Sequence, residues 1–276
     1  FVMEKLFSLK NKTAVITGAS GAIGGAIAKG FAAAGANLAL TFNSNSEAAE
    51  TIVAVAQALG VKARADWVNI VDAESVQNHA EMVEREFGQI DILLNSAGGN
   101  IKAAITNKDK GFFDLDPQDI RDTVHLNFLG GAVLPCLSYG GIMAKGANGG
   151  SIINISSMNA FRPLEGRPAY AASKAAVNNF TQWLACHVAK EYTDALRVNA
   201  IAPGFFPNER MRDGLFDEDG KLNDRGQKII AHTPMGRIGD VNDLVGTAVW
   251  YASNASKFVT GTVTPVDGGF NAYAGL

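Results

Sequence analysis

Two side chains that could exchange protons stand four residues apart in the segment from Tyr170 to Lys174. Residues four apart share one face of a helix, so a helix here would bring the Lys174 ammonium beside the Tyr170 phenol. A free phenol has a pKa near about 10, which makes it a poor acid–base group at neutral pH, and a neighbouring cation lowers that pKa by stabilising the phenolate. The pair therefore predicts that Tyr170 is a proton shuttle whose pKa is lowered by Lys174. Taken alone, the spacing also fits a surface lysine beside a half-buried tyrosine.

Length and composition fit one large α/β domain or two small ones. The chain has 276 residues, 47% of them hydrophobic, and a net charge of −3, so it shows no basic footprint for nucleic acid or an anionic membrane surface. We see no uninterrupted apolar run of membrane-spanning length and no secretory-signal pattern in the first ten residues. Cys136 and Cys186 are far apart and lack metal-ligand spacing. We expect a cytoplasmic protein without a metal, a nucleic-acid partner or a membrane partner.

Short apolar segments alternate with helical segments along the whole chain. Strands are expected at residues 13–17, 37–42, 62–66, 90–94, 151–155, 196–201 and 262–266, and helices at 23–34, 47–59, 75–87, 117–144 and 168–191. This alternation predicts βαβ units: a single Rossmann-type domain over residues 1–276, with a doubly wound parallel sheet of about seven strands and helices on both faces. The polar, irregular segment 205–233 breaks the rhythm, and we interpret it as a substrate lid.

A glycine-rich turn, Thr-Gly-Ala-Ser-Gly-Ala-Ile-Gly, occupies residues 17–24 between the first expected strand and helix. Glycines let the backbone turn tightly and approach a pyrophosphate, which the N-terminus of the following helix stabilises. Such a turn can be purely structural, but its position after a buried strand favours dinucleotide binding. The predicted cofactor contacts in the turn are Gly18, Ser20, Ala22, Ile23 and Gly24.

Together with further motifs, this turn makes nearly the whole chain resemble the short-chain dehydrogenase/reductase family. The other motifs are Asn-Ser-Ala-Gly at 95–98, Asn127 in His-Leu-Asn-Phe-Leu, Ser157 thirteen residues before Tyr170, Pro203-Gly204, and Val-Asp-Gly-Gly at 266–269. The resemblance implies an oxidoreductase that interconverts a secondary alcohol and a ketone, with a catalytic tetrad of Asn127, Ser157, Tyr170 and Lys174. Ala22 and Ser96 depart from the family pattern, which has Gly and Asn at these positions, and neither change removes a catalytic group.

The residue types of the tetrad fit carbonyl reduction. A developing alkoxide needs a hydrogen-bond donor, which Ser157 supplies, and a proton, which Tyr170 supplies. By resemblance, Lys174 also binds the nicotinamide ribose, and Asn127 holds a water that leads protons to Lys174. A helical Asn and a strand-end Ser often only satisfy backbone groups, but their joint spacing with Tyr170 favours catalysis.

The end of the second expected strand indicates which dinucleotide binds. An acid there would bind the 2′-hydroxyl of NAD and repel the phosphate of NADP. The chain has Phe42 and Asn43 instead, with no acid before Glu47 and no basic residue from 43 to 46. We therefore expect NADP(H) to be preferred by a small margin, with NAD(H) possible. The resemblance adds cofactor contacts at Asp66, Trp67, Asn95, Ala97, Gly98, Tyr170, Lys174, Pro203 and Gly204, although packing alone would also account for Trp67.

Polar and cationic residues surround the predicted cleft. They suit a hydroxylated, carboxylated small molecule because arginine binds carboxylate bidentately, whereas a steroid or acyl chain would need an apolar wall. Residues 157–163 and 231–237 resemble the sugar-acid branch of the family, which includes D-mannonate oxidoreductases and gluconate 5-dehydrogenase-like enzymes. Solvation, or pairing with Asp213 and Asp217, would equally explain the lid arginines. The predicted substrate contacts are Asn100, Asn159, Arg162, Arg167 and Arg210.

We predict an NAD(P)(H)-dependent oxidoreductase for a sugar or sugar acid. Two alternatives stay open: a 3-oxoacyl thioester ketoreductase, and a non-catalytic dinucleotide-binding regulator, since fold does not fix function. The helices at 117–144 and 168–191 carry more apolar residues than one sheet face can cover. The resemblance implies a homotetramer with residues 270–276 near an interface.

Overall fold

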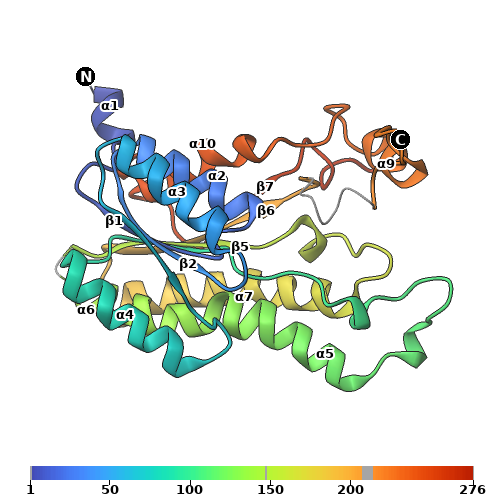
Figure 1. Ribbon diagram of the computed structural model, residues 1–276, viewed down its shortest axis with the longest axis horizontal. Helices are drawn as coiled ribbons and strands as arrows, with labels where there is room; N and C mark the ends of the chain where they lie inside the picture. The colour runs from blue at the N-terminus through green and yellow to red at the C-terminus, as the bar shows by residue number, and fades with distance from the viewer. Residues whose placement is uncertain (1, 147, 207–213, 276) are drawn as a thin grey trace.

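Seven short segments rich in Val, Ile, Leu and Ala form a fully parallel sheet in the computed structural model, which describes residues 2–146, 148–206 and 214–275 (Figure 1). Helices cover both faces, so the strands read as nearly continuous apolar runs. The strand order is β3-β2-β1-β4-β5-β6-β7, which confirms the predicted doubly wound fold. The strands are β1 (Thr13–Thr17), β2 (Asn37–Phe42), β3 (Ala63–Trp67), β4 (Ile92–Asn95), β5 (Gly150–Ile155), β6 (Leu196–Pro203) and β7 (Val263–Val266).

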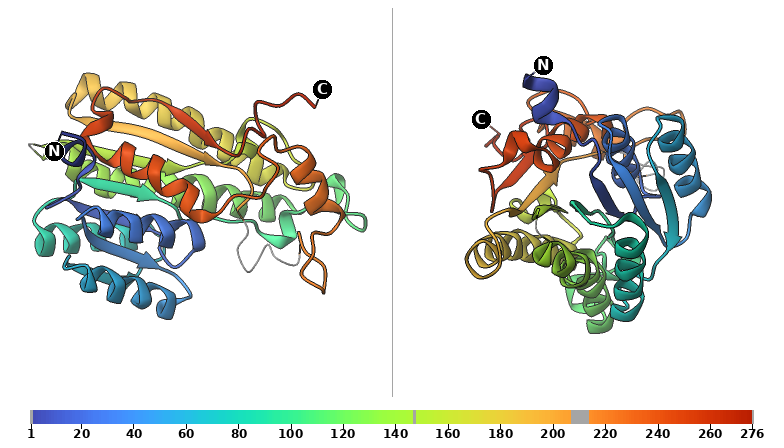
Figure 2. Two further views of the ribbon diagram at one scale, coloured as in Figure 1. Left: turned by 90° about the horizontal axis from the view of Figure 1, so that it is seen from above. Right: turned by 90° about the vertical axis from the view of Figure 1, so that its left-hand side faces the viewer.

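Two helical layers enclose the sheet (Figures 1 and 2). Above it in Figure 1 lie α2 (Ala22–Ala33), α3 (Ser46–Ala58) and α10 (Val245–Ala252). Below it lie α4 (Ala73–Phe87), α7 (Pro168–Glu191) and one continuous helix made of α5 (Pro117–Val124), η3 (His125–Val133), η4 (Cys136–Gly140) and α6 (Gly141–Lys145). Each layer has its own core: Phe31 and Tyr251 are fully buried above the sheet, and Tyr139 and Met143 below it.

The strand order reverses beside β1, which pairs with β2 on one side and β4 on the other. In open parallel sheets, ligands bind outside the carboxyl ends of the strands at such a reversal. Thr17 and Asn95, the last residues of β1 and β4, are register partners there. The glycine-rich turn and the Asn-Ser-Ala-Gly motif therefore meet at this edge.

The predicted elements differ from the structure mainly near the C-terminus. Strand ends agree within two residues, but α1 (Val2–Phe7), α9 (Asp224–Ala231) and α10 were not predicted. The segment 205–233 is therefore not irregular throughout: Asn223 caps α9 by accepting a hydrogen bond from the Gly226 N–H, and Ile229 is buried. Residues 207–213 of that segment lie outside the described part of the chain.

The helix Pro117–Lys145 is long and apolar enough to cross a membrane, with a mean hydropathy of 1.3, contrary to the expectation that no such segment exists. More than half of its apolar window, 56%, is buried inside the protein. Tyr139 and Met143 from this helix belong to the lower core, together with residues of α4 and α7. The helix Pro117–Lys145 is therefore a core helix of this fold.

A line of buried amides joins the middle of the sheet to α7. The Asn95 Nδ2 donates to Asn154 Oδ1 at 2.8 Å, and the Asn154 Nδ2 donates to Thr181 Oγ1 at 2.9 Å. All three side chains are buried, so each bond lost would leave a polar group without water or a partner. These bonds fix β4 and β5 relative to α7, which carries Tyr170 and Lys174.

Asn154→Ala should lower the free energy of unfolding by about 1 to 3 kcal/mol, because the buried Asn95 amide loses its acceptor at 2.8 Å and keeps only the weaker contact with Cys136 Sγ at 3.5 Å, while the Thr181 hydroxyl loses one of its two hydrogen bonds. The matched control is Asn148→Ala, since Asn148 is exposed and donates only to the exposed Gln89. Urea denaturation followed by circular dichroism measures both variants. Equal stability of the two variants would show that the buried amides contribute nothing.

Candidate active site

β5 ends and α7 begins at the same edge of the sheet. Ser157, which follows β5, and Tyr170, in the first turn of α7, therefore lie close together. Ser157 follows β5 and caps the short η5 helix (Met158–Ala160), where its Oγ accepts from the Asn159 N–H at 3.1 Å. Tyr170 lies in the first turn of α7, which begins at Pro168. A hydrogen bond joins the Ser157 and Tyr170 side chains. The two hydroxyls predicted to act on one oxygen are therefore neighbours.

Lys174 lies one turn further along α7 and is buried. Its Nζ donates to the Ile155 carbonyl oxygen at 2.8 Å and lies 5.7 Å from the centroid of the Tyr170 ring. Burial lowers the pKa of Lys174 to about 8 because the charged form loses water. The predicted Tyr–Lys pair on one helix face is present.

The pKa of Tyr170 is raised, where the sequence predicts that Lys174 lowers it. Burial raises the pKa of Tyr170, while the hydrogen bond with Ser157 and the charge of Arg167 lower it without outweighing burial. Lys174 is not among these causes. The phenol is therefore held mainly in its protonated form, which suits a proton donor.

Asn127 lies in η3, a π-helical stretch of the kind often found at functional sites. Its Nδ2 donates to the Gly99 and Thr123 carbonyl oxygens at 2.7 and 2.9 Å, and its Oδ1 accepts from the Gly99 N–H at 2.9 Å. The side chain is fully buried and clamps the loop after β4.

At Gly98, the loop that Asn127 holds lies close to Lys174. A Cβ on Gly98 would lie 2.8 Å from Asn127 Oδ1 and 3.7 Å from Lys174 Nζ. Gly131 allows the helix to approach, because a Cβ there would lie 2.9 Å from the Ala97 carbonyl oxygen. The structure thus brings Asn127, Ser157, Tyr170 and Lys174 to one place.

The turn after β1 has the shape of a dinucleotide cradle. Gly18 has φ +65°, and a Cβ on it would lie 2.8 Å from Ala97 Cα; a Cβ on Gly24 would lie 2.6 Å from the Gly18 carbonyl oxygen. No side chain caps the N-terminus of α2, so its first N–H groups remain free to bind an anion. Thr17 Oγ1 accepts from the Ser96 and Ala97 N–H groups and ties this turn to the loop after β4. The residues present fit a pyrophosphate at Ser20, Ala22 and Ile23.

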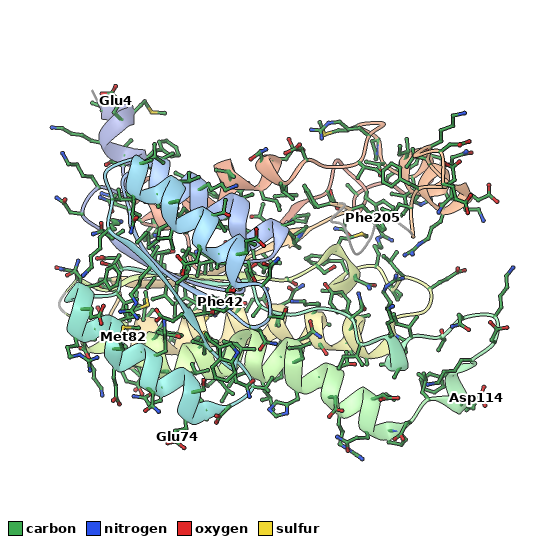
Figure 3. The ribbon with its side chains drawn as sticks, viewed as in Figure 1. Glu4, Phe42, Glu74, Met82, Asp114 and Phe205 are labelled. Atoms are coloured by element: carbon green, nitrogen blue, oxygen red, sulfur yellow. The ribbon has the colours of Figure 1, made fainter. Side chains whose placement is uncertain are left out.

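The end of β2 carries no described cation. Phe42 and Trp67 are register partners on adjacent strands, and Trp67 is 60% exposed, as an aromatic platform for a base would be (Figure 3 labels Phe42). Asn43 is exposed. Within the described residues, the nearest arginine on β3, Arg64, is held by Asp66 and Glu86. A 2′-phosphate bound here would not be repelled by a carboxylate at the end of β2, and no free guanidinium among the described residues would pair with it.

Three side chains that were predicted to contact a ligand are bound to other residues of the protein. Asp66 lies against Arg64 and 3.4 Å from His79 Nε2; burial raises its pKa, but these partners outweigh burial and lower it to about 2. Asn95 is bound to Asn154, and the Asn159 Oδ1 accepts from the Leu164 N–H at 2.9 Å. The Asn95 and Asn159 side chains are buried and bound within the protein.

The other predicted substrate residues have different surroundings. Arg162 donates from Nε and Nη2 to the Asn271 carbonyl oxygen, at 3.2 and 2.9 Å, and so holds the C-terminal segment. Asn100 is exposed on the loop after β4, and Arg167 is half-buried beside Tyr170. Arg210 lies outside the described residues.

The loop after β6 forms the remaining edge of the site. Gly204, which follows Pro203, lies close to β7: its N–H donates to the Val266 carbonyl oxygen at 3.0 Å, and a Cβ on it would lie 2.8 Å from Asp267 Cα. Phe205, labelled in Figure 3, packs on Phe270 with ring centroids 5.3 Å apart, and His232 contacts Phe270 at 5.4 Å. The C-terminal segment therefore packs on residues that border the site of its own chain.

Arg225, in the first turn of α9, was missed because the surrounding segment was predicted to lack helices. Burial lowers the pKa of Arg167, and the charge of Arg225 lowers it further. The signal in the sequence was Asn223 followed by an acid and, later, two isoleucines, a capping pattern with an apolar helix face.

Lys174→Met should stabilise the protein at pH 7, and the gap to wild type should narrow as the pH rises towards 10.5. The folded-state pKa, about 8, lies below the ordinary value of 10.5, so the unfolded state binds more protons between these pH values and wild-type stability gains with pH. Thermal unfolding midpoints from pH 7 to 10.5 measure the difference. The exposed Lys190→Met on the same helix is the control, and the same trend there would contradict the assignment to Lys174.

Known proteins match this chain over almost its full length. A family model described as enoyl-(acyl carrier protein) reductase matches residues 18–271. An uncharacterized oxidoreductase of Haemophilus influenzae is 42% identical, covering 98% of this chain and 96% of that protein. The gluconate 5-dehydrogenase of Gluconobacter oxydans is 34% identical over 96% of both chains.

Solved structures agree with the observed fold. The crystal structure of a Haemophilus influenzae protein assigned as a D-mannonate oxidoreductase, with bound NAD, has a TM-score of 0.90 and 42% identity, covering 99% of this chain and 100% of that one. A gluconate 5-dehydrogenase of Burkholderia cenocepacia, in complex with NADP and tartrate, has a TM-score of 0.85 and 29% identity, covering 99% and 100%. The chain belongs to the short-chain dehydrogenase/reductase family, whose members are oxidoreductases acting on alcohol groups.

Proposed function

We propose that this oxidoreductase interconverts a secondary alcohol and a ketone on a sugar acid, with Asn127, Ser157, Tyr170 and Lys174 as its catalytic residues. The hydrogen-bonded Ser157–Tyr170 pair beside the buried Lys174 carries the proposal. Two hydroxyls that share one acceptor position can stabilise a developing alkoxide and protonate it.

Each residue has a part that follows from its surroundings. In reduction, the Tyr170 hydroxyl donates its proton to the substrate oxygen, while the Ser157 hydroxyl donates a hydrogen bond to it. Lys174, with a pKa of about 8, exchanges a proton readily near neutral pH. Asn127 holds the loop after β4 against Lys174 through both of its side-chain atoms. The nicotinamide dinucleotide, when bound, supplies or accepts the hydride.

A sugar acid is the favoured substrate class. Arg167 lies beside Tyr170, and relatives assigned to gluconate and D-mannonate support the same class. The 3-oxoacyl thioester alternative is supported by a 3-oxoacyl-(acyl-carrier-protein) reductase of Staphylococcus aureus that is 31% identical to this chain, a lower identity than that of the relatives assigned to D-mannonate and gluconate at 42% and 34%. We propose that the described residues from Gly204 to Thr233 close one side of this cleft.

Tyr170→Phe should reduce turnover by at least about a thousandfold, because the variant has no proton to donate to the alkoxide. Dinucleotide affinity should change less than about threefold, since the ring remains. NAD(P)H oxidation against fructuronate, 5-ketogluconate and an acetoacetyl thioester, together with fluorescence titration of the cofactor, measures both. Wild-type rates in the variant, or thioester activity alone in the wild type, would contradict the proposal.

We propose that the site accepts both dinucleotides, with NADP(H) preferred by no more than about tenfold. Phe42 stands where an acid would repel the 2′-phosphate of NADP, so that repulsion is absent. No described cation lies at this position to bind the phosphate. Phe42→Asp should shift the ratio of kcat/KM values towards NAD at least tenfold, by like-charge repulsion. Phe42→Asn, which adds no charge, is the control. A strong NAD preference in the wild type would overturn the proposed margin.

We further propose a cytoplasmic homotetramer. Large apolar side chains are exposed on the lower helical layer, among them Leu137 at 69% and Trp183 at 57%. Other apolar residues of α7, such as Val177, are buried in the core. An assembly would cover the exposed residues.

A further inference from the structure

A buried histidine on α4, in the lower layer of Figure 1, lies between a tyrosine of the core and the end of β3. His79 is 6% exposed, and its Nδ1 is 2.8 Å from the Tyr139 hydroxyl oxygen, with the two rings edge to face at 5.8 Å. Its Nε2 lies 3.4 Å from Asp66 Oδ2 and has no other partner among the described residues. His79 thus joins a fully buried phenol to a carboxylate that is 21% exposed.

The position of the imidazole proton follows from these two neighbours. With the proton on Nε2, Nδ1 accepts the Tyr139 hydroxyl proton and Nε2 presents its N–H to Asp66. The other tautomer would leave the Tyr139 hydroxyl without an acceptor in the described part of the chain, and would set a lone pair against a carboxylate. Burial, with the charge of Asp66, raises the pKa of Tyr139, so its hydroxyl keeps the proton that it donates. Tyr139 therefore fixes which nitrogen faces Asp66.

Asp66 can accept one further hydrogen bond. Arg64 binds both of its carboxylate oxygens, and His79 faces only Oδ2. Because a carboxylate has about four acceptor sites, Oδ1 retains capacity for another donor. Burial raises the pKa of Asp66, but the hydrogen bonds with His79 and Arg64 outweigh burial and lower it to about 2. At neutral pH this side chain is therefore an acceptor only.

Thr41 connects Asp66 to the glycine-rich turn. Thr41 is the register partner of Asp66 on β2. Its Oγ1 accepts from the Gly18 N–H at 3.4 Å, and its carbonyl oxygen accepts from the Ala19 N–H at 2.9 Å. Adjacent strands lie about 4.8 Å apart, so Asp66 is one strand beyond the residue that contacts the turn. A dinucleotide whose pyrophosphate binds at that turn extends its adenosine across the end of β2, which brings the adenine towards Asp66.

We propose that His79, held by Tyr139, is a positioning residue that orients Asp66 as the acceptor for the exocyclic amine of the adenine. This inference rests on the nicotinamide dinucleotide of the proposed function and concerns its adenine end, away from the reacting groups. An oriented carboxylate favours the amine of adenine over the exocyclic oxygen of hypoxanthine, which is itself an acceptor. The preference between the two bases therefore reports how the carboxylate is held.

The test compares NADH with its hypoxanthine analogue, reduced nicotinamide hypoxanthine dinucleotide. The fluorescence of the dihydronicotinamide measures the binding of each to the protein without substrate. Wild type should bind NADH about ten- to a hundredfold more tightly than the analogue, and His79→Leu should narrow that ratio at least about fivefold. His79→Gln, whose amide can still donate to Asp66, should recover part of the ratio. The control is Asn78→Leu, at the exposed neighbouring position on α4.

A second variant separates positioning from a general loss of packing. Tyr139→Phe removes only the hydroxyl that fixes His79, and it should narrow the same ratio about two- to fivefold. Equal losses of affinity for both dinucleotides, the same narrowing in Asn78→Leu, or no preference for NADH in wild type would overturn the positioning role. A base preference that depends on His79, in a protein that turns over no sugar acid, would refute the proposed function alone.

Discussion

The backbone of residues 97–99 is the constraint on which the site depends. A Cβ on Gly18 would meet Ala97 Cα at 2.8 Å, a Cβ on Gly131 would meet the Ala97 carbonyl oxygen at 2.9 Å, and Asn127 holds Gly99 through both its amide atoms. The loop 97–99 therefore lies in close contact with the glycine-rich turn on one side and with η3 on the other. A larger residue at either glycine would separate the two halves of the site, because backbone atoms cannot rotate out of the way.

Burial is the main influence on the pKa values of the two side chains that would exchange protons, Tyr170 and Lys174. The free side chains titrate at 10.0 and 10.5, tyrosine just below lysine, but in the fold burial raises the pKa of Tyr170 and lowers that of Lys174 to about 8. The order is therefore reversed, since burial penalises a phenolate and an ammonium alike. The groups that favour the phenolate here are the hydroxyl of Ser157 and the guanidinium of Arg167.

The sequence predicts the frame of the site better than its surroundings, for a physical reason. Strand–helix alternation and motif spacing are local, and they placed Ser157, Tyr170 and Lys174 correctly. Whether Asn95, Asn159 and Asp66 face a ligand or the interior depends on partners distant in the chain, such as Asn154 and His79, and no spacing reveals these. α9 was missed because a short helix of mixed composition has a weak periodic signal, and its cap was overlooked.

The parts that hold the reacting groups and the parts that would choose the substrate are built differently. The tetrad stands on β5, α7 and η3, which pack on the buried sheet. The wall beyond it is formed by loops and the short helix α9, held by contacts such as Arg162 to the Asn271 carbonyl oxygen and His232 to Phe270 and Tyr273. Segments of this kind can change sequence at little cost to the core, because connections on the surface tolerate substitution. Substrate specificity would therefore reside in α9 and the C-terminal segment, and proton transfer in the layer beneath the sheet.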